Sequence, residues 1–205
     1  MNGFLTLPAI LVSAVVLTAC GGGGSSSPES DHSSAVANSA EVSSQGQVEE
    51  ESADTADTIV IAGCEVEQYQ ADMLRKVNAA RASARSCGSE QFAPAEPLTY
   101  NCPIEGAAEH HSNDMASNNF FSHTGSNGLR VGARVTATGY EWSVVGENIA
   151  AGYDDVDTVV QAWLDSPGHC RNIMEPKFSQ FAVRRVDTNR ADYENYWTQV
   201  FATPE

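Results

Sequence analysis

A long acidic stretch near the start of the chain limits where a folded core can form. Residues 21–58 contain no Phe, Trp, Tyr, Lys or Arg. Such a segment buries too little apolar surface to offset the entropy of ordering it, and its like charges repel one another. We therefore predict a disordered acidic tether over residues 20–58 and one folded domain over residues 59–205. The eight acidic residues of the tether are Glu29, Asp31, Glu41, Glu49, Glu50, Glu51, Asp54 and Asp57.

The residues before this tether have the pattern of an export signal. An apolar run from Phe4 to Ala19 is too short to cross a bilayer and ends in small residues at Cys20. The sequence LTAC, which ends at Cys20, resembles the lipobox of bacterial lipoproteins, in which cleavage leaves an acylated N-terminal cysteine. We predict a signal peptide over residues 1–19 and an exported lipoprotein anchored in a membrane at the cell envelope or surface through Cys20. A buried apolar strand or hairpin is the alternative.

The charge of the chain excludes some partners. The net charge is −16, and removing the eight negative charges of the tether leaves −8 for residues 59–205. A moderately acidic domain without a face rich in Lys and Arg argues against nucleic-acid binding and against adsorption to anionic lipid. Its length suits one domain with one core, and we expect a monomer.

Four cysteines remain once Cys20 is assigned to lipidation: Cys64, Cys87, Cys102 and Cys170. An even number in an exported chain favours two disulfides, which could form in three pairings. A zinc site is the alternative, although the spacing contains no Cys-x2-Cys pair. Cys64 and Cys87 bracket a predicted helix about 27 Å long, so geometry counts against pairing them.

Apolar spacing predicts the main elements of the domain. Helices are predicted over residues 67–85 and 104–116, and a third begins at Asp154 or Asp155. Short strands are predicted at residues 146–150, 181–186 and 195–201.

Three histidines and one glutamate lie in informative positions. His111 lies on the apolar stripe of the second helix, where we expect a core imidazole bonded to the backbone, and His110 is expected to face solvent. His123 begins a Gly-rich loop, a common place for functional side chains. Glu147 lies in the strand-like sequence GENIA, where a carboxylate must be paired or bind a cation if it is buried.

Six motifs then occur in a recognisable order: HS-DMA from His111, FSHTG from Phe121, GY from Gly139, GENIA from Gly146, WLDSPGHCRNIM from Trp163 and YWTQVF from Tyr196. Over residues 66–202 the chain resembles the bacterial branch of the CAP superfamily, also called the SCP or cysteine-rich secretory protein domain. The resemblance implies an α/β fold: a three-layer α-β-α sandwich with a mixed, largely antiparallel central sheet and a cleft on one face.

The resemblance also indicates which residues line the cleft. In animal and plant members it contains two histidines and two glutamates, and metal binding there has been proposed. His123 and Glu147 match the first histidine and the glutamate of the GEN motif. The second histidine falls at Tyr196, which we expect to place a hydroxyl beside the other groups. The second glutamate has no acidic counterpart beyond Ser166, where His169 lies nearby.

His169 completes the predicted cluster. Ser166 and Pro167 suit the cap and first position of a short helix, which would place His169 in its first turn, near amide donors that disfavour protonation. We predict that His123, Glu147 and His169 meet in the cleft. Two imidazoles and a carboxylate suit zinc, the candidate cofactor, whereas the same trio without metal would be a hydrogen-bonded core.

The resemblance bears on the disulfides as well. Many bacterial relatives keep counterparts of Cys64, Cys87 and Cys170, and pair the last with a cysteine near Arg184 that is absent here. On that basis we expect Cys64 to pair with Cys87, and Cys170 to pair with Cys102.

Two classes of function follow. The first is a non-catalytic binding module that holds a lipid, a sterol or an envelope component in the cleft, as reported across the superfamily. The alternative is a metal-dependent extracellular hydrolase with Glu147 as its base, although a base that also binds the metal cannot act freely. No G-x-S-x-G motif is present for a serine nucleophile. The aromatic residues expected at the cleft are Phe120, Phe121, Tyr140, Trp142 and Trp197.

Overall fold

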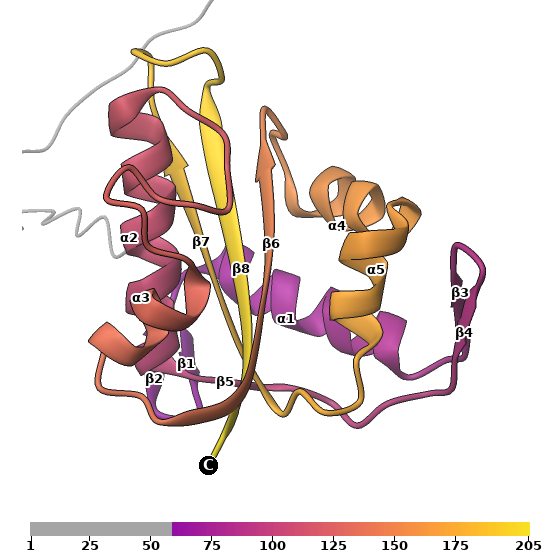
Figure 1. Cartoon of the computed structure of the whole chain (residues 1–205). Helices are drawn as coiled ribbons and strands as arrows, with labels where there is room; N and C mark the ends of the chain where they lie inside the picture. The colour runs from indigo at the N-terminus through magenta and orange to yellow at the C-terminus, as the bar shows by residue number, and fades with distance from the viewer. Residues whose placement is uncertain (1–58) are drawn as a thin grey trace, which may run out of the picture. The chain divides into compact units, whose positions relative to one another are not determined.

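The computed structural model describes residues 59–205 (Figure 1). The predictions about the signal peptide, Cys20 and the tether lie outside the described residues. Within residues 59–205 no helix is long and apolar enough to span a membrane. The elements are β1 (Ile59–Ile61), β2 (Cys64–Val66), α1 (Gln68–Arg81), β3 (Arg85–Cys87), β4 (Glu90–Phe92), β5 (Thr99–Tyr100), α2 (Cys102–Asn118), α3 (Val131–Ala137), β6 (Trp142–Ala151), α4 (Val156–Asp165), α5 (Pro167–Met174), β7 (Gln180–Asp187) and β8 (Asn195–Pro204).

Four strands form the central sheet in the order β5-β7-β8-β6. β8 pairs antiparallel with β7 on one side and with β6 on the other, so that Val200 lies between Ala182 and Glu147. The short strand β5 runs parallel to β7. The prediction of a mixed, largely antiparallel sheet is confirmed, and β6 forms one of its edges.

Neighbouring side chains of β8 show that helices cover both faces of this sheet. The Ser112 hydroxyl of α2 donates a 2.8 Å hydrogen bond to Thr198 Oγ1. The preceding residue, Trp197, packs edge-on against Tyr69 of α1. Since successive residues of a strand point to opposite faces, α2 and α1 lie on opposite sides. α3 contacts α2, whereas α4 and α5 contact α1 (Figure 1), and the predicted three-layer sandwich is confirmed.

The helices begin where the sequence indicates. Asp155 caps α4, since its carboxylate accepts a 2.8 Å bond from the Thr158 backbone N–H. α5 begins at Pro167 as predicted, although the Ser166 side chain makes no capping bond. α1 ends at Arg81, earlier than predicted, because the chain turns into β3.

Helix α3 and the hairpins β1–β2 and β3–β4 are absent from the predictions. α3 has the sequence VGARVTA, in which glycine and β-branched residues give a weak helical signal. Packing explains the glycine, because a Cβ at Gly132 would lie 2.8 Å from Cζ2 of Trp142. Gly132 thus allows α3 to approach the start of β6 closely.

Arg81 joins the end of α1 to the segment between α5 and β7. Its side chain is fully buried, and its guanidinium donates only to backbone carbonyls among the described residues, those of Glu96, Ile173, Glu175 and Phe178. Burial lowers the pKa of Arg81. These bonds fix the irregular chain on both sides of α1.

The disulfides differ from the expected pairing. Cys64 bonds to Cys102, and Cys87 bonds to Cys170. Cys64 precedes α1 and Cys87 follows it, and a helix of 14 residues separates them by about 21 Å. The expectation of Cys64–Cys87 and Cys102–Cys170 is therefore wrong, and the geometric argument against it was right. The first disulfide ties the β1–β2 hairpin to the start of α2, and the second ties the β3–β4 hairpin to α5.

Candidate functional site

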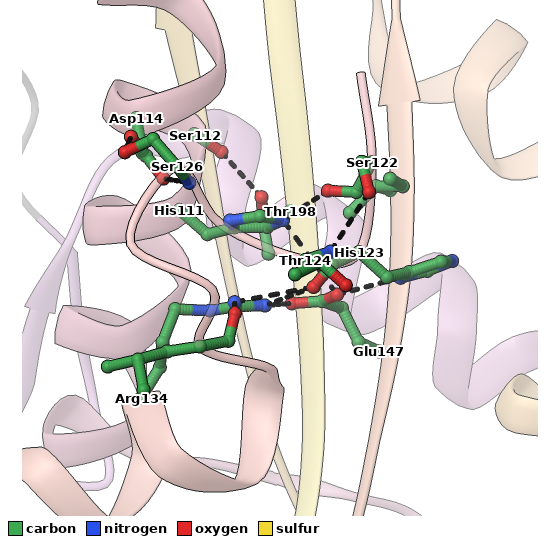
Figure 2. Close-up of polar contacts among 12 residues, drawn as sticks. His111, Ser112, Asp114, Ser122, His123, Thr124, Ser126, Arg134, Glu147 and Thr198 are labelled. Atoms are coloured by element: carbon green, nitrogen blue, oxygen red, sulfur yellow. Dashed lines mark hydrogen bonds and ion pairs between the residues drawn. The ribbon is translucent and has the colours of Figure 1, made fainter. Parts of the chain in front are cut away.

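Glu147 is the centre of a buried polar network on β6. Its side chain is 3% exposed and points to the face that α2 and α3 cover (Figure 2). Arg134 Nη2 of α3 donates to Glu147 Oε2 over 2.5 Å, and His123 Nδ1 lies 2.7 Å from Oε1. A buried carboxylate is costly unless it is paired, and both oxygens of Glu147 have a partner.

The loop that carries His123 is held by two helices. From α2, His111 Nε2 lies 2.9 Å from the carbonyl oxygen of Ser122, to which it donates. From α3, Arg134 Nη1 donates to the carbonyl oxygen of Leu129 over 2.8 Å. Arg134 therefore positions the loop and pairs with the carboxylate at the same time.

Asp114 of α2 provides a third anchor for this loop. Its carboxylate accepts bonds from the backbone N–H of Ser126 at 2.8 Å and from the Ser126 hydroxyl at 2.6 Å (Figure 2). A Cβ at Gly125 would lie 2.9 Å from Asp114 Oδ2, so the approach requires glycine. Burial raises the pKa of Asp114, but the hydrogen bonds from Ser126 and Asn118 lower it more, and the net pKa lies below the usual range.

His111 is a buried imidazole bonded to the backbone, as predicted. Because Nε2 donates to a carbonyl, the neutral ring carries its proton there and leaves Nδ1 without one. Burial lowers the pKa of His111, although the charge of Glu147, whose Oε1 lies 3.9 Å from Nε2, acts in the opposite direction. His110 is exposed, as expected.

The backbone of His169 lies on the face of β6 opposite to the Glu147 side chain. Asn148 follows Glu147 in the strand and so points to the other face, where its Nδ2 donates to the His169 carbonyl over 3.2 Å. Burial lowers the pKa of His169, and the nearby His123 lowers it further. Among residues 59–205 the structure pairs His123 with Glu147 and leaves His169 outside this pair.

Tyr196 is also placed apart from Glu147. It is fully buried, and its partner on β6 is Ala151, whereas Glu147 pairs with Val200. The Tyr196 ring packs edge-on against Tyr193, with centroids 5.9 Å apart. Burial raises the pKa of Tyr196. Its side chain belongs to a small apolar cluster beside α2.

Three side-chain amides fix α5 against the sheet. Asn172 Nδ2 of α5 donates to the Glu147 carbonyl at 2.9 Å and to Asn148 Oδ1 at 2.8 Å. Asn148 in turn donates to Gln199 Oε1 of β8 over 2.9 Å. These amides belong to the motifs GENIA, RNIM and YWTQVF, so part of the motif pattern positions the helix that carries His169.

A pocket of about 300 Å³ lies beside β6 on the α4–α5 side. Residues 149–151 of the strand and His169 of α5 are among the residues that line it. None of the lining residues is Asp, Glu, Lys or Arg. Phe121 and Tyr193 are 48% and 44% exposed at the rim, with ring centroids 6.2 Å apart. Four aromatic rings line the pocket: Phe121, Tyr153, Trp163 and Tyr193.

The aromatic residues of the pocket were mostly not predicted. Of the five expected at the cleft, Phe121 alone lines this pocket, whereas Trp197 is fully buried. Tyr153 and Tyr193 lie in the connections after β6 and before β8. Their positions depend on how the strands pair, which the sequence pattern did not resolve.

The three predicted zinc ligands are not gathered into one group among the residues that the structure describes. Within residues 59–205, no group of three or more His, Cys, Asp and Glu side chains is placed to hold a metal ion. Glu147 already pairs with Arg134 and His123, and this network does not include the His169 side chain. The pair suits proton transfer better through His123 than through Glu147, because the carboxylate holds Nδ1 and leaves Nε2 as the outward nitrogen.

Arg134 is the main site residue that the sequence reasoning missed. Its side chain is 3% exposed, as is that of Glu147. The available signal was an arginine within the otherwise small and apolar segment VGARVTA, together with a glutamate in a buried strand. Because an isolated buried charge is costly, a buried arginine implies an acidic partner and a buried glutamate implies a basic one.

Comparison with known proteins identifies the family. Residues 74–201, more than half of the chain, match the model described as "CAP: Cysteine-rich secretory protein family". The protein YkwD of Bacillus subtilis strain 168, itself uncharacterized, is 28% identical over 149 residues, which are 73% of this chain and 52% of YkwD. The uncharacterized membrane protein YlbC of the same strain is 32% identical over 104 residues, 51% of this chain and 28% of YlbC. The chain spans about half or less of the length of these relatives.

Solved structures show the same fold. An extracellular protein containing an SCP domain from Bacillus anthracis aligns with a TM-score of 0.54 and 27% identity, covering 65% of this chain and 40% of that one. An outer surface protein of Borrelia burgdorferi aligns with a TM-score of 0.50 and 21% identity, covering 54% of this chain and 80% of that one.

Proposed function

Because this chain belongs to the cysteine-rich secretory protein (CAP) family, we propose that it is an exported, non-catalytic binding module. Its ligand is an uncharged group that enters the pocket between β6 and α4–α5. The observation that carries this proposal is the composition of the pocket: four aromatic rings and a half-buried imidazole, with no charged lining residue. Concave sites lined by aromatic and apolar side chains with a few polar groups are typical of ligand binding.

The geometry beside the pocket supports binding over hydrolysis. Glu147 is held between Arg134 and His123, so it is not free to act as a base. Among residues 59–205, the ring of His123 bonds to Glu147 and to no serine, threonine or cysteine nucleophile. A nucleophile within hydrogen-bond reach of its base is the signature of covalent catalysis. The paired groups act as a rigid frame behind the pocket.

Export and anchoring form the second half of the proposal. The similar protein from Bacillus anthracis is described as extracellular, and two disulfides suit an oxidising compartment. We propose that acylated Cys20 holds the domain at a membrane of the cell envelope. Replacing Cys20 by Ala should move the protein out of the membrane fraction or leave it as a precursor. Wild-type protein without an acyl mass on Cys20 would contradict the anchor.

A fragment experiment tests the binding proposal. We would titrate 15N-labelled purified protein with indole, phenol and benzamide as uncharged probes of the pocket. Amide shift changes should cluster at Phe121, Tyr193 and residues 149–151, and Ala162→Trp, which fills the pocket, should remove them. Changes spread over the surface would contradict the proposal.

A separate assay tests the absence of catalysis. The purified protein and its His123→Ala variant would be incubated with casein and with a nitrophenyl ester. We expect no turnover by either protein above the buffer rate. Turnover by the wild type that is lost in His123→Ala would show that the site is catalytic and would overturn the proposal.

A further inference from the structure

The pairing of β6 leaves one row of its main-chain groups directed away from the sheet. Opposite residues in an antiparallel pair alternate between those that exchange both main-chain bonds and those that exchange none. At the end of the strand, the Gly152 N–H donates to the Asn195 carbonyl over 3.0 Å. This bond shows which alternate residues of β6 bond to β8 and which do not. Ala151, Ile149 and Glu147 therefore point their N–H and C=O groups away from β8.

Side chains of α4 and α5 bond to two of these outward carbonyls, which confirms that the groups point away from β8. Trp163 Nε1 donates to the Ile149 carbonyl over 3.1 Å, and Asn172 Nδ2 donates to the Glu147 carbonyl over 2.9 Å. Both donors lie on the outer side of β6. Within residues 59–205, the outward groups near the pocket to which no such bond is made are the N–H of Ile149 and both main-chain groups of Ala151, two residues along the strand.

This row and the pocket occupy the same place. Residues 149–151 are the strand residues that line the pocket, beside the exposed rings of Phe121 and Tyr193. A ligand in the pocket therefore meets two donors, the N–H groups of Ile149 and Ala151, and one acceptor, the carbonyl of Ala151. These groups have the two-residue spacing of a β-strand. An added strand presents its own N–H and C=O groups with the same two-residue repeat.

From this the geometry points to a ligand class: an extended peptide segment that adds as a short strand to the outer edge of β6 and places one aromatic or apolar side chain in the pocket. This inference rests on the proposed binding function. The ligand residue opposite Ala151 exchanges both main-chain bonds with it, and the residue two positions along accepts from the Ile149 N–H.

Charge and space define the segment further. The pocket has no charged lining residue, and residues 59–205 carry a net charge of −8, so a neutral or basic peptide is favoured over an acidic one. A volume of about 300 Å³ accommodates one large side chain. Trp163 and Asn172 already donate to the carbonyls of Ile149 and Glu147, so a ligand cannot pair with β6 beyond Ile149. The paired stretch is therefore about two ligand residues long.

A scan of N-methylated peptides tests the strand geometry. The probe is acetyl-KTFTK-amide, compared with five versions that each carry one N-methyl group, titrated into the 15N-labelled purified protein. The unmodified probe should shift the amides of Ile149 and Ala151. Methylation should weaken binding at least tenfold at the two positions opposite Ala151 and Ile149, whose N–H groups face β6. The other positions should stay within about twofold, since alternate N–H groups of a strand point away from its partner.

Matched variants test the pocket. Ala162 of α4 lines the pocket, whereas its neighbour Gln161 is exposed and does not. Ala162→Trp should weaken the probe at least tenfold, and Gln161→Trp should leave it unchanged. The melting temperature of each variant shows that it is folded. Equal binding by both variants, or tolerance of methylation at every position, would overturn the inference.

Other outcomes separate this inference from the proposed function. Binding of neutral cello-oligosaccharides at residues 149–151 with no response to any peptide would overturn the peptide while leaving a binding module. Cleavage of the bound probe would overturn the non-catalytic function and leave the peptide assignment. Shifts at Ile149 and Ala151 that grow with protein concentration, without any probe, would mean that a second copy pairs there instead.

Discussion

The two faces of β6 differ in how their polar groups are used. On the side of α2 and α3, Glu147, Arg134 and His123 form ion pairs and hydrogen bonds with one another, and the carboxylate is almost fully buried. On the side of α4 and α5, His169 and residues 149–151 of the strand border a pocket. A strand alternates its side chains between faces, so adjacent residues of one motif, Glu147 and Asn148, serve two different structures. The closed face is a buried network of paired charges, whereas the open face borders a pocket.

The largest effect should come from breaking the ion pair on the closed face. Glu147→Ala leaves the Arg134 guanidinium buried without its partner, and such a loss costs about 3–5 kcal/mol. Urea unfolding of the purified protein measures the change. The double variant Glu147→Leu with Arg134→Met should recover most of the loss, because no unpaired charge remains. Equal destabilisation by the single and double variants would show that packing, not charge pairing, stabilises this face.

A smaller effect is expected from the amides behind the pocket. Asn172→Ala removes two hydrogen bonds and leaves the buried Asn148 amide oxygen without that donor, at a cost of about 1–3 kcal/mol. The control is Arg171→Ala, whose side chain is 46% exposed in its contact with Glu90, and which should cost less than about 1 kcal/mol. If Asn172→Ala costs no more than Arg171→Ala, the amides do not fix α5.

The individual elements were predictable because they follow from residue periodicity, whereas the three-layer arrangement was implied by the family resemblance. Apolar spacing indicated α1, α2 and α4, and the short strands predicted at residues 146–150, 181–186 and 195–201 correspond to β6, β7 and β8. The β1–β2 and β3–β4 hairpins were missed, since strands of three residues carry almost no periodic signal. The disulfide pairing failed for the same reason, because Cys64 and Cys87 lie in those hairpins.

The site was predictable only in part. His123 and Glu147 could be paired from the motifs, and the structure places them 2.7 Å apart. The position of His169 across the strand depends on the alternation that puts Asn148 and α5 on the other face. The GENIA sequence predicts that Glu147 and Asn148 point to opposite faces of the strand. It does not predict which helices cover each face, and so could not place α5. Arg134 came from a helix that was not predicted.

A histidine on each face should make the protein less stable at low pH. Burial lowers the pKa of His111 in the folded protein, so the unfolded chain binds more protons below its ordinary pKa of about 6.5. Stability is therefore full above that pH and declines as the pH falls from about 6.5 toward the lowered pKa. His169 has the same sign, from burial and from His123. Urea unfolding at pH 7 and pH 5 should show a smaller decline for His111→Gln than for the wild type. An unchanged decline in both His111→Gln and His169→Gln would assign it to carboxylates instead.

The smallest expected effect is that of zinc, which would act across both faces. A zinc ion bound by His123, Glu147 and His169 would have to displace Arg134 or His123 from the carboxylate and draw in the imidazole of His169, which is near His123 but outside the pair. Zinc at 100 times its dissociation constant would stabilise the folded protein by about 2.7 kcal/mol. We expect calorimetric titration at neutral pH to show no saturable uptake, and the melting temperature to stay unchanged. A zinc-dependent rise in melting temperature that is lost in both His123→Ala and His169→Ala, but kept in His110→Ala, would show that the two faces rearrange around the metal and would restore the metal-dependent hydrolase as a candidate.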